Sequence, residues 1–127
     1  MKNDDFLPGK KVRRVLEKHL TAQGWHLEAN GIPNHNIDIE ARRGREKWII
    51  EVKGTESPAP VIFSSFVSAL GGILRRMDDQ NCKYSIALPD TKPFRRLWER
   101  LPAIAKDRTG ITALFVDQNG GVEETTG

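Results

Sequence analysis

Acidic residues on two neighbouring segments of this chain have the types and spacing needed to bind a metal ion. Asp38 and Glu40 share one face of a predicted strand because side chains alternate with a period of two, and Glu51 and Lys53 share a face of the next strand. An Arg-Gly-Arg turn at residues 43–45 separates the two segments. If the strands pair through this turn, Asp38 lies near Glu51.

This arrangement of charges is suited to metal-assisted hydrolysis of a phosphodiester. Two adjacent carboxylates repel one another, so a divalent cation between them is favoured, and oxygen ligands suit Mg²⁺ or Mn²⁺. A lysine beside such a site can orient a water or stabilise the charge that develops on a phosphate. A sheet with one solvated face would carry the same residue types, and the pattern of the strands by itself leaves that alternative open.

The pattern of an acid followed two residues later by lysine occurs in two different contexts. Residues 51–53 (Glu-Val-Lys) lie inside an apolar strand, whereas residues 90–92 (Asp-Thr-Lys) lie between two prolines, in a predicted loop. Two charged residues on one face of an apolar strand call for an explanation. The first occurrence is therefore the candidate site.

Asp38, followed by Glu51-Val52-Lys53 in the order helix, three strands, helix, strand, resembles the PD-(D/E)XK nuclease superfamily. This superfamily has the restriction-endonuclease-like fold and includes Holliday-junction resolvases, and the resemblance spans residues 10–116. It implies that Asp38 and Glu51 bind the metal, that the Val52 carbonyl is a further ligand, and that Lys53 assists the attacking water. Glu17 matches a first-helix glutamate that many members carry near the metal.

Two positions depart from the pattern of that superfamily. Ile37 stands where the motif has proline before the aspartate. Gly71 and Gly72 stand where some relatives carry a polar residue, often glutamine, on the helix after the Glu-x-Lys motif.

The composition predicts one globular α/β domain over residues 1–127. Charged residues make up 29% and hydrophobic residues 38%, and the net charge is +3. The lone cysteine, Cys82, excludes an intrachain disulfide framework, and this favours a reducing, cytoplasmic location. The first residues do not resemble a signal peptide, and residues 57–74 contain too many proline, serine and glycine residues for a membrane span. The chain shows no glycine-rich phosphate loop, so we expect no organic cofactor.

Hydrophobic periodicity predicts a mixed central sheet flanked by helices, in the order αβββαβαβ. The first three strands are expected to form an antiparallel meander, and the second helix is expected to begin at a cap on Ser64 or Ser65 and to bury Leu74. The expected helices are 10–23, 64–77 and 92–101, and the expected strands are 25–29, 37–42, 47–53, 84–88, 111–116 and a short one near Val122. The tryptophans Trp25, Trp48 and Trp98 are expected in the core.

Basic residues recur on several of these elements and predict contact with a nucleic-acid backbone. A solvated helix face is the alternative for each cluster. The candidate nucleic-acid-binding residues are Lys10, Lys11, Arg13, Arg14, Arg43, Arg45, Arg75 and Arg76.

These observations favour a Mg²⁺- or Mn²⁺-dependent endonuclease that acts on DNA without reading a long sequence. The resemblance also suggests a homodimer. The alternatives are a non-catalytic nucleic-acid-binding or scaffold module that retains the fold, and an enzyme that acts on RNA.

Overall fold

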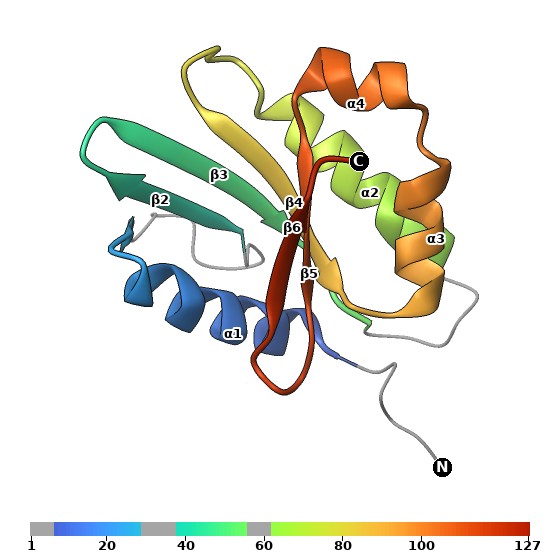
Figure 1. Cartoon of the computed structure of the whole chain (residues 1–127), viewed down its shortest axis with the longest axis horizontal. Helices are drawn as coiled ribbons and strands as arrows, with labels where there is room; N and C mark the ends of the chain where they lie inside the picture. Colours follow the sequence, from blue (N-terminus) through green and yellow to red (C-terminus); the bar gives the residue numbers. More distant parts are fainter. Residues whose placement is uncertain (1–6, 29–37, 56–61) are drawn as a thin grey trace.

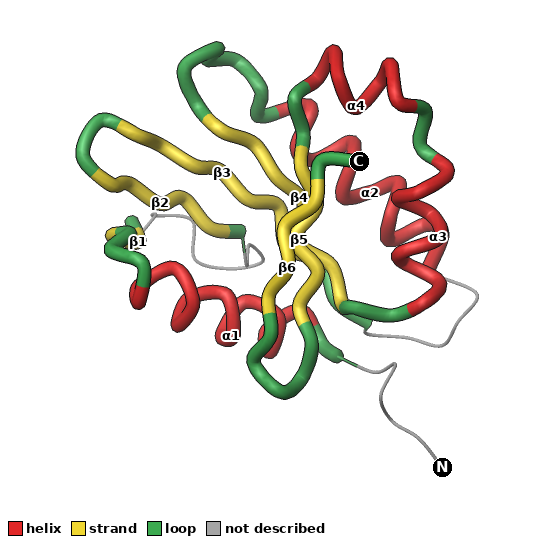
Figure 2. Tube along the Cα trace, viewed as in Figure 1, coloured by secondary structure: helices red, strands yellow, loops and turns green. Residues whose placement is uncertain are grey.

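The computed structural model describes residues 7–28, 38–55 and 62–127 (Figures 1 and 2). The helices are α1 (Gly9–Ala22), α2 (Ile62–Arg75), α3 (Lys92–Arg100) and α4 (Ala103–Thr109). The strands are β1 (His26–Leu27), β2 (Ile39–Arg43), β3 (Glu46–Val52), β4 (Lys83–Pro89), β5 (Thr112–Val116) and β6 (Val122–Thr125). The predicted fold class is confirmed: a mixed sheet is flanked by helices.

The six strands form one sheet in their sequence order, from β1 to β6. The first three strands are antiparallel, which confirms the predicted meander, and β3, β4 and β5 run parallel to one another. The parallel connections pass through α2 and through α3 with α4, whereas β6 returns antiparallel to β5. The sheet thus places the ends of β3, β4 and β5 at one edge.

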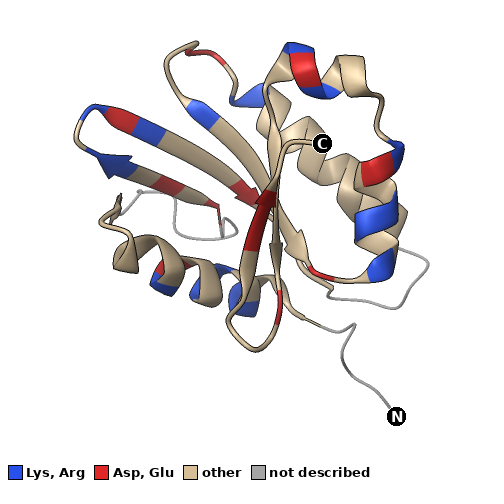
Figure 3. Ribbon diagram, viewed as in Figure 1, with Lys and Arg blue, Asp and Glu red and all other residues tan. Residues whose placement is uncertain are grey.

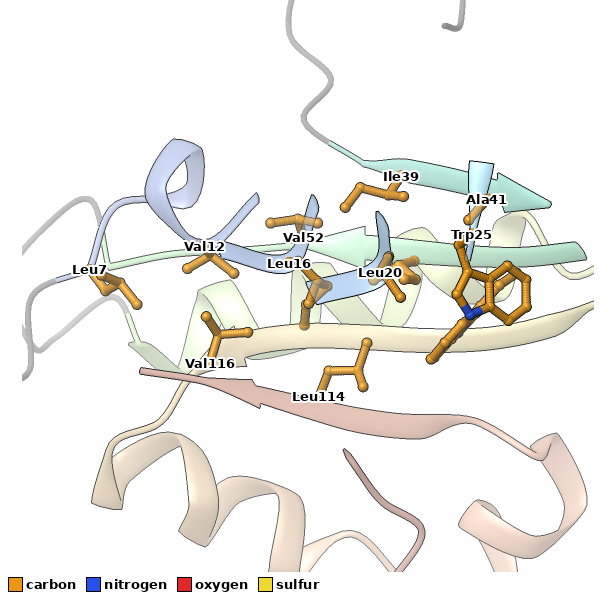
Figure 4. Packing of buried hydrophobic residues seen from close by; sticks show 13 residues of the cluster. Leu7, Val12, Leu16, Leu20, Trp25, Ile39, Ala41, Val52, Leu114 and Val116 are labelled. Atoms are coloured by element: carbon orange, nitrogen blue, oxygen red, sulfur yellow. The ribbon is translucent and has the colours of Figure 1, made fainter. Parts of the chain in front are cut away.

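Helix α1 covers one face of the sheet and forms the first hydrophobic core. Its side chains at Val12, Leu16 and Leu20 follow the helical spacing and are at most 1% exposed. They pack against Ile50 and Val52 of β3, together with residues of β2, β4 and β5 (Figure 4). Alternate residues of the sheet therefore belong to this core.

The opposite face of the sheet packs against α2 and α3, which form the second core. Phe66 and Ile73 of α2 and Phe94 of α3 contact the intervening residues of the strands, including Ile49 of β3 and Ile86 of β4. Helix α4 lies on this side of the sheet beside α3 (Figure 1). Because strand β3 is covered on both faces, its polar residue Glu51 lies near packed elements rather than on a free surface.

Several boundaries differ from those predicted. Helix α2 begins at Ile62, so Ser64 and Ser65 lie inside it and the predicted cap is wrong. Leu74 is 49% exposed because the buried stripe of the helix runs through Phe66, Ala69 and Ile73 instead. The predicted cap of α3 is confirmed, since the Thr91 hydroxyl accepts a hydrogen bond from the Phe94 amide.

The segment after Pro102 forms a separate helix, α4, that the sequence reading missed. Pro102 takes an extended conformation and α4 starts at the next residue, while Gly110 ends it with a φ of 71°. Strand β1 comprises only His26 and Leu27, and Ala29 and the predicted strand start at Ile37 lie outside the described residues.

The three tryptophans are buried, as predicted, at 7%, 6% and 2% exposure for Trp25, Trp48 and Trp98. Trp25 and Trp48 pack edge to face, with ring centroids 5.3 Å apart. None of the described helices has both the length and the apolar character that a membrane crossing requires.

Truncation of a core residue of α1 tests the packing of this helix on the sheet. Leu16 is fully buried, so we expect Leu16→Ala to lower the free energy of unfolding by about 2–5 kcal/mol. Phe63→Ala, at a residue that is 64% exposed, should change it by less than about 0.5 kcal/mol. Urea unfolding measures both, and equal effects would contradict the assignment of the core.

Candidate metal centre

Strand register brings the two predicted carboxylates together at the start of β2. Ile39 pairs with Ile50, so Asp38 lies opposite Glu51 in the antiparallel ladder. The Val52 amide, two residues beyond the Ile39–Ile50 pair, donates to Asp38 Oδ1 over 3.0 Å. The side chain of Asp38 therefore contacts the backbone of β3 directly. Both polar groups of an antiparallel strand residue face the same neighbour, so the Val52 carbonyl lies on the Asp38 side.

Burial and the neighbouring carboxylate raise the pKa of Glu51 to about 7. Burial is the larger cause, and the negative charge of Asp38 and a side-chain hydrogen bond with it act in the same direction. The positive charges of Lys53 and Arg76 oppose the shift. Asp38, Glu51 and Lys53 are thus close enough to interact, as the sequence predicted.

Helix α2 passes so close to Glu51 that a side chain at Gly72 would have to displace the Glu51 carboxylate. A Cβ atom on Gly72 would lie 2.5 Å from Glu51 Oε2 and 2.6 Å from Glu51 Cδ. A Cβ atom on the adjacent Gly71 would meet nothing within 4 Å. From the sequence alone, Gly71 and Gly72 mark only the position where some relatives carry a polar residue, whereas the structure shows that Gly72 leaves room for the Glu51 carboxylate.

Arg76, one residue beyond α2, reaches the acidic residues of β2. Its Nη1 lies 3.3 Å from Asp38 Oδ2, and its Nη2 donates to Glu40 Oε2. Glu40 Oε1 is also 4.0 Å from Lys47 Nζ on β3. Sequence reasoning assigned Arg76 to a nucleic-acid backbone and missed this contact, because the end of α2 and the start of β2 are adjacent only in three dimensions.

Glu17 makes a different contact from the one that the resemblance implies. Its Oε2 accepts a hydrogen bond of 2.7 Å from Arg13 Nε, and Arg13 Nη1 donates to the Asp38 carbonyl over 3.1 Å. Arg13 therefore links α1 to the start of β2. The role of Glu17 beside a metal stays a prediction.

The donors at Asp38 and Glu51 fit a hard divalent cation. Two carboxylates and a main-chain carbonyl supply oxygen atoms only, and Mg²⁺ is commonly held by one or two carboxylates with water and phosphate in its other positions. Across residues 7–28, 38–55 and 62–127, no group of three or more His, Cys, Asp and Glu side chains is arranged to hold a metal ion. The candidate centre is thus one that needs water or a phosphate oxygen to complete its coordination shell.

The candidate nucleic-acid-binding residues divide into paired and exposed ones. Arg13 and Arg76 have the partners given above, and Arg43 binds Glu46 over 3.1 Å and stacks on Trp25 at 4.4 Å. The exposed members are Lys10, Lys11, Arg14, Arg45 and Arg75. Positive residues lie along α1 and at the tip of the β2–β3 hairpin, while negative residues lie on both strands of the hairpin (Figure 3).

The fold and the acidic pair define a small mixed α/β protein with a candidate divalent-cation site at the edge of its sheet. Solved structures share this fold. A crystal structure of an XisH family protein from Nostoc punctiforme matches with a TM-score of 0.63 and 20% identity, over 89% of this chain and 96% of the other. An fdxN element excision controlling factor protein from Anabaena variabilis matches with a TM-score of 0.61 and 20% identity, over 89% and 95%.

No protein-family model and no curated protein sequence matches the chain. The structural matches show the fold, and membership of the PD-(D/E)XK superfamily stays a prediction from the motif residues.

Paired glycine substitutions test the close contact between α2 and Glu51. Gly71→Ala should stabilise the protein by about 0.5–1 kcal/mol, because alanine favours a helix and the site is open. Gly72→Ala should displace the Glu51 carboxylate and leave the protein less stable than Gly71→Ala by about 1 kcal/mol or more. Urea unfolding measures the difference.

The control for this pair is the same comparison in an Glu51→Ala background, where the obstructed carboxylate is absent. The difference between the two alanine variants should then largely disappear. A difference of the same size in both backgrounds would show that Gly72 does not act through Glu51.

The raised pKa of Glu51 makes stability depend on pH. Its folded-state pKa of about 7 lies above the ordinary value of 4.5, so the folded state binds the proton more tightly than the unfolded chain. The contribution of this bound proton to the free energy of unfolding is fully present below pH 4.5 and is lost as the pH rises to about 7. We expect the free energy of unfolding of the wild type, relative to Glu51→Gln, to fall across this range.

Urea unfolding at several pH values measures this difference. Glu46→Gln, on the same strand but exposed, controls for the general loss of a carboxylate. A wild-type advantage over Glu51→Gln that stays constant with pH would rule out a buried, proton-binding Glu51.

Proposed function

We propose that this protein is a divalent-metal-dependent endonuclease that hydrolyses phosphodiester bonds in DNA. The observation that carries the proposal is the hydrogen-bonded pair of Asp38 and Glu51, with Lys53 close enough to lower the pKa of Glu51. When both are ionised, these two partly buried carboxylates repel one another, and Mg²⁺ or Mn²⁺ would supply the positive charge that offsets the repulsion.

Each residue of the site has a role that follows from its chemistry. Asp38 and Glu51 would provide carboxylate oxygens for the metal, and the Val52 carbonyl would provide a third oxygen. A bound Mg²⁺ or Mn²⁺ would supply Lewis acidity and lower the pKa of an attacking water. The ammonium group of Lys53 would orient that water or stabilise the charge that develops on the phosphate.

A DNA substrate is supported by charge and by one structural neighbour. The exposed basic residues of α1, with Arg45 and Arg75, can contact the phosphate groups of DNA. Such contacts do not depend on the base sequence. The neighbour from Anabaena variabilis is an fdxN element excision controlling factor protein, and this supports a DNA-related role. Structure-selective or nonspecific cutting follows, because the basic surface offers backbone contacts. Homodimerisation and a cytoplasmic location stay predictions.

A second candidate is a non-catalytic nucleic-acid-binding module with the same fold. It is favoured by the Arg76 guanidinium, which already lies against Asp38 and Glu40 and neutralises part of their charge. This candidate predicts binding of DNA that is independent of divalent metal.

Removal of either carboxylate tests the nuclease. We expect Asp38→Asn and Glu51→Gln to lower the rate of DNA cleavage in Mg²⁺ or Mn²⁺ by about 100-fold or more, because each replaces a negatively charged carboxylate ligand with a neutral amide. Glu46→Gln is the matched control on the same strand and should cut at the wild-type rate. Cleavage of plasmid, branched, flapped and single-stranded DNA is measured, with RNA duplexes in parallel.

Calorimetric titration with Mn²⁺, with and without a short DNA duplex, accompanies the cleavage assay. Binding by the wild type that is lost in Glu51→Gln supports the metal centre. DNA binding without any effect of metal or of the two variants would favour the non-catalytic module and refute the nuclease.

A further inference from the structure

Arg76 occupies the position beside Asp38 where a cation is needed. Its guanidinium contacts Asp38 at 3.3 Å and also binds Glu40, and the three side chains are only 25%, 11% and 22% exposed. The Arg76 amide donates to the Ile73 carbonyl over 3.0 Å, so the backbone of this residue stays attached to the last turn of α2. The side chain therefore extends from an anchored point into the acidic cluster.

The charges around this point balance without a metal. The acidic members are Asp38, Glu40 and Glu51, and the basic members are Lys47, Lys53 and Arg76. Three negative and three positive groups leave no net charge when all are ionised. A divalent cation at Asp38 and Glu51 would give the same cluster a net charge of +2.

A metal ion and Arg76 would compete for the same oxygen atoms. Asp38 Oδ1 accepts from the Val52 amide, and Asp38 Oδ2 is the atom that faces Arg76. A cation that takes Oδ2 removes one of the two partners of the guanidinium and repels it electrostatically. The guanidinium then has donors to spare, and its planar fork matches the oxygens of a phosphate group.

We propose that Arg76 is a stored counter-ion: it neutralises the acidic cluster while no metal is bound, and metal binding releases it to contact the phosphodiester of the substrate. This inference rests on the proposed function and assigns a specific residue to substrate binding. It requires that metal and DNA bind cooperatively, since each displaces or recruits the same side chain. By linkage, the metal increases the affinity for DNA by the factor by which DNA increases the affinity for the metal.

Titration of Mn²⁺ into the wild type, Arg76→Gln and Arg108→Gln tests the proposal. Arg108 is the matched control because it is an exposed arginine of α4 and is not among the candidate nucleic-acid-binding residues. The titrations are run at about pH 8, where proton competition at Glu51 is reduced. Without DNA, we expect Arg76→Gln to bind Mn²⁺ about tenfold more tightly than the wild type, because the competing positive charge is gone. Arg108→Gln should match the wild type.

The second arm repeats the titrations with a short DNA duplex at saturating concentration. DNA should tighten Mn²⁺ binding by the wild type and by Arg108→Gln. In Arg76→Gln most of this gain should be lost, since the side chain that couples the two ligands is absent. Arg76→Lys, which retains the charge but not the planar fork, should fall between Arg76→Gln and the wild type in both arms.

The outcomes separate the inference from the function on which it rests. Equal Mn²⁺ affinity of the wild type and Arg76→Gln, or weaker binding by Arg76→Gln, overturns the stored counter-ion and leaves the metal centre standing. Absence of Mn²⁺ binding by every variant overturns both. Binding by Arg76→Gln alone supports the inference in its strongest form.

Thermal unfolding with and without Mn²⁺ shows that the variant is folded. Arg76→Gln should be less stable than the wild type in the absence of metal, because the carboxylates lose their counter-ion. Mn²⁺ should then raise its melting temperature more than that of the wild type. An equal rise in the two proteins would contradict the proposed competition.

Discussion

The carboxyl groups of Asp38 and Glu51, on adjacent strands, share a hydrogen bond when Glu51 is protonated and need positive charge beside them when both are ionised, and the rest of this site is arranged around that need. The register of β2 and β3 places Asp38 opposite Glu51, where burial and mutual repulsion disfavour a second negative charge. The positive charges of Lys53 and Arg76 oppose this effect. The same need makes the site receptive to a divalent cation, which supplies two positive charges at a single point.

The layers of the fold explain why the acidic pair is partly buried and still accessible. Helix α1 covers one face of β2 and β3, whereas α2 lies on the other face of β3 and β4 and ends beside the acidic residues. Gly72 allows the helix to approach the Glu51 carboxylate, and Arg76 follows where the helix has ended. One helix terminus thus determines both the space and the charge available at the centre.

The relation to known structures is one of architecture. Chains of 20% identity share the fold over 89% of this chain and at least 95% of their own length. Function depends on a few polar residues at the sheet edge. The arguments for chemistry therefore come from Asp38, Glu51, Lys53 and Arg76 and from the charges that surround them.

The sequence alone identified much of the fold because its signals are local. The alternation in β2 and β3 and the helical spacing of Val12, Leu16 and Leu20 predicted these elements, and the turn between the strands placed Asp38 near Glu51. The separate helix α4 was missed because Pro102 could end one helix or precede another. The start of α2 was misplaced because two serines inside the helix resembled a cap.

What the sequence determined by itself was the identity and strand position of the acidic residues, since neighbours in a hairpin follow from spacing. Only the tertiary structure decided which basic side chain lies beside these carboxylates and which glycine makes room for them. Arg76 meets Asp38 and Glu40, and Gly72 meets Glu51, across separations of more than twenty residues. Such contacts depend on how α2 crosses the sheet, and that is set by the packing of its buried side chains against β3 and β4 rather than by any local pattern.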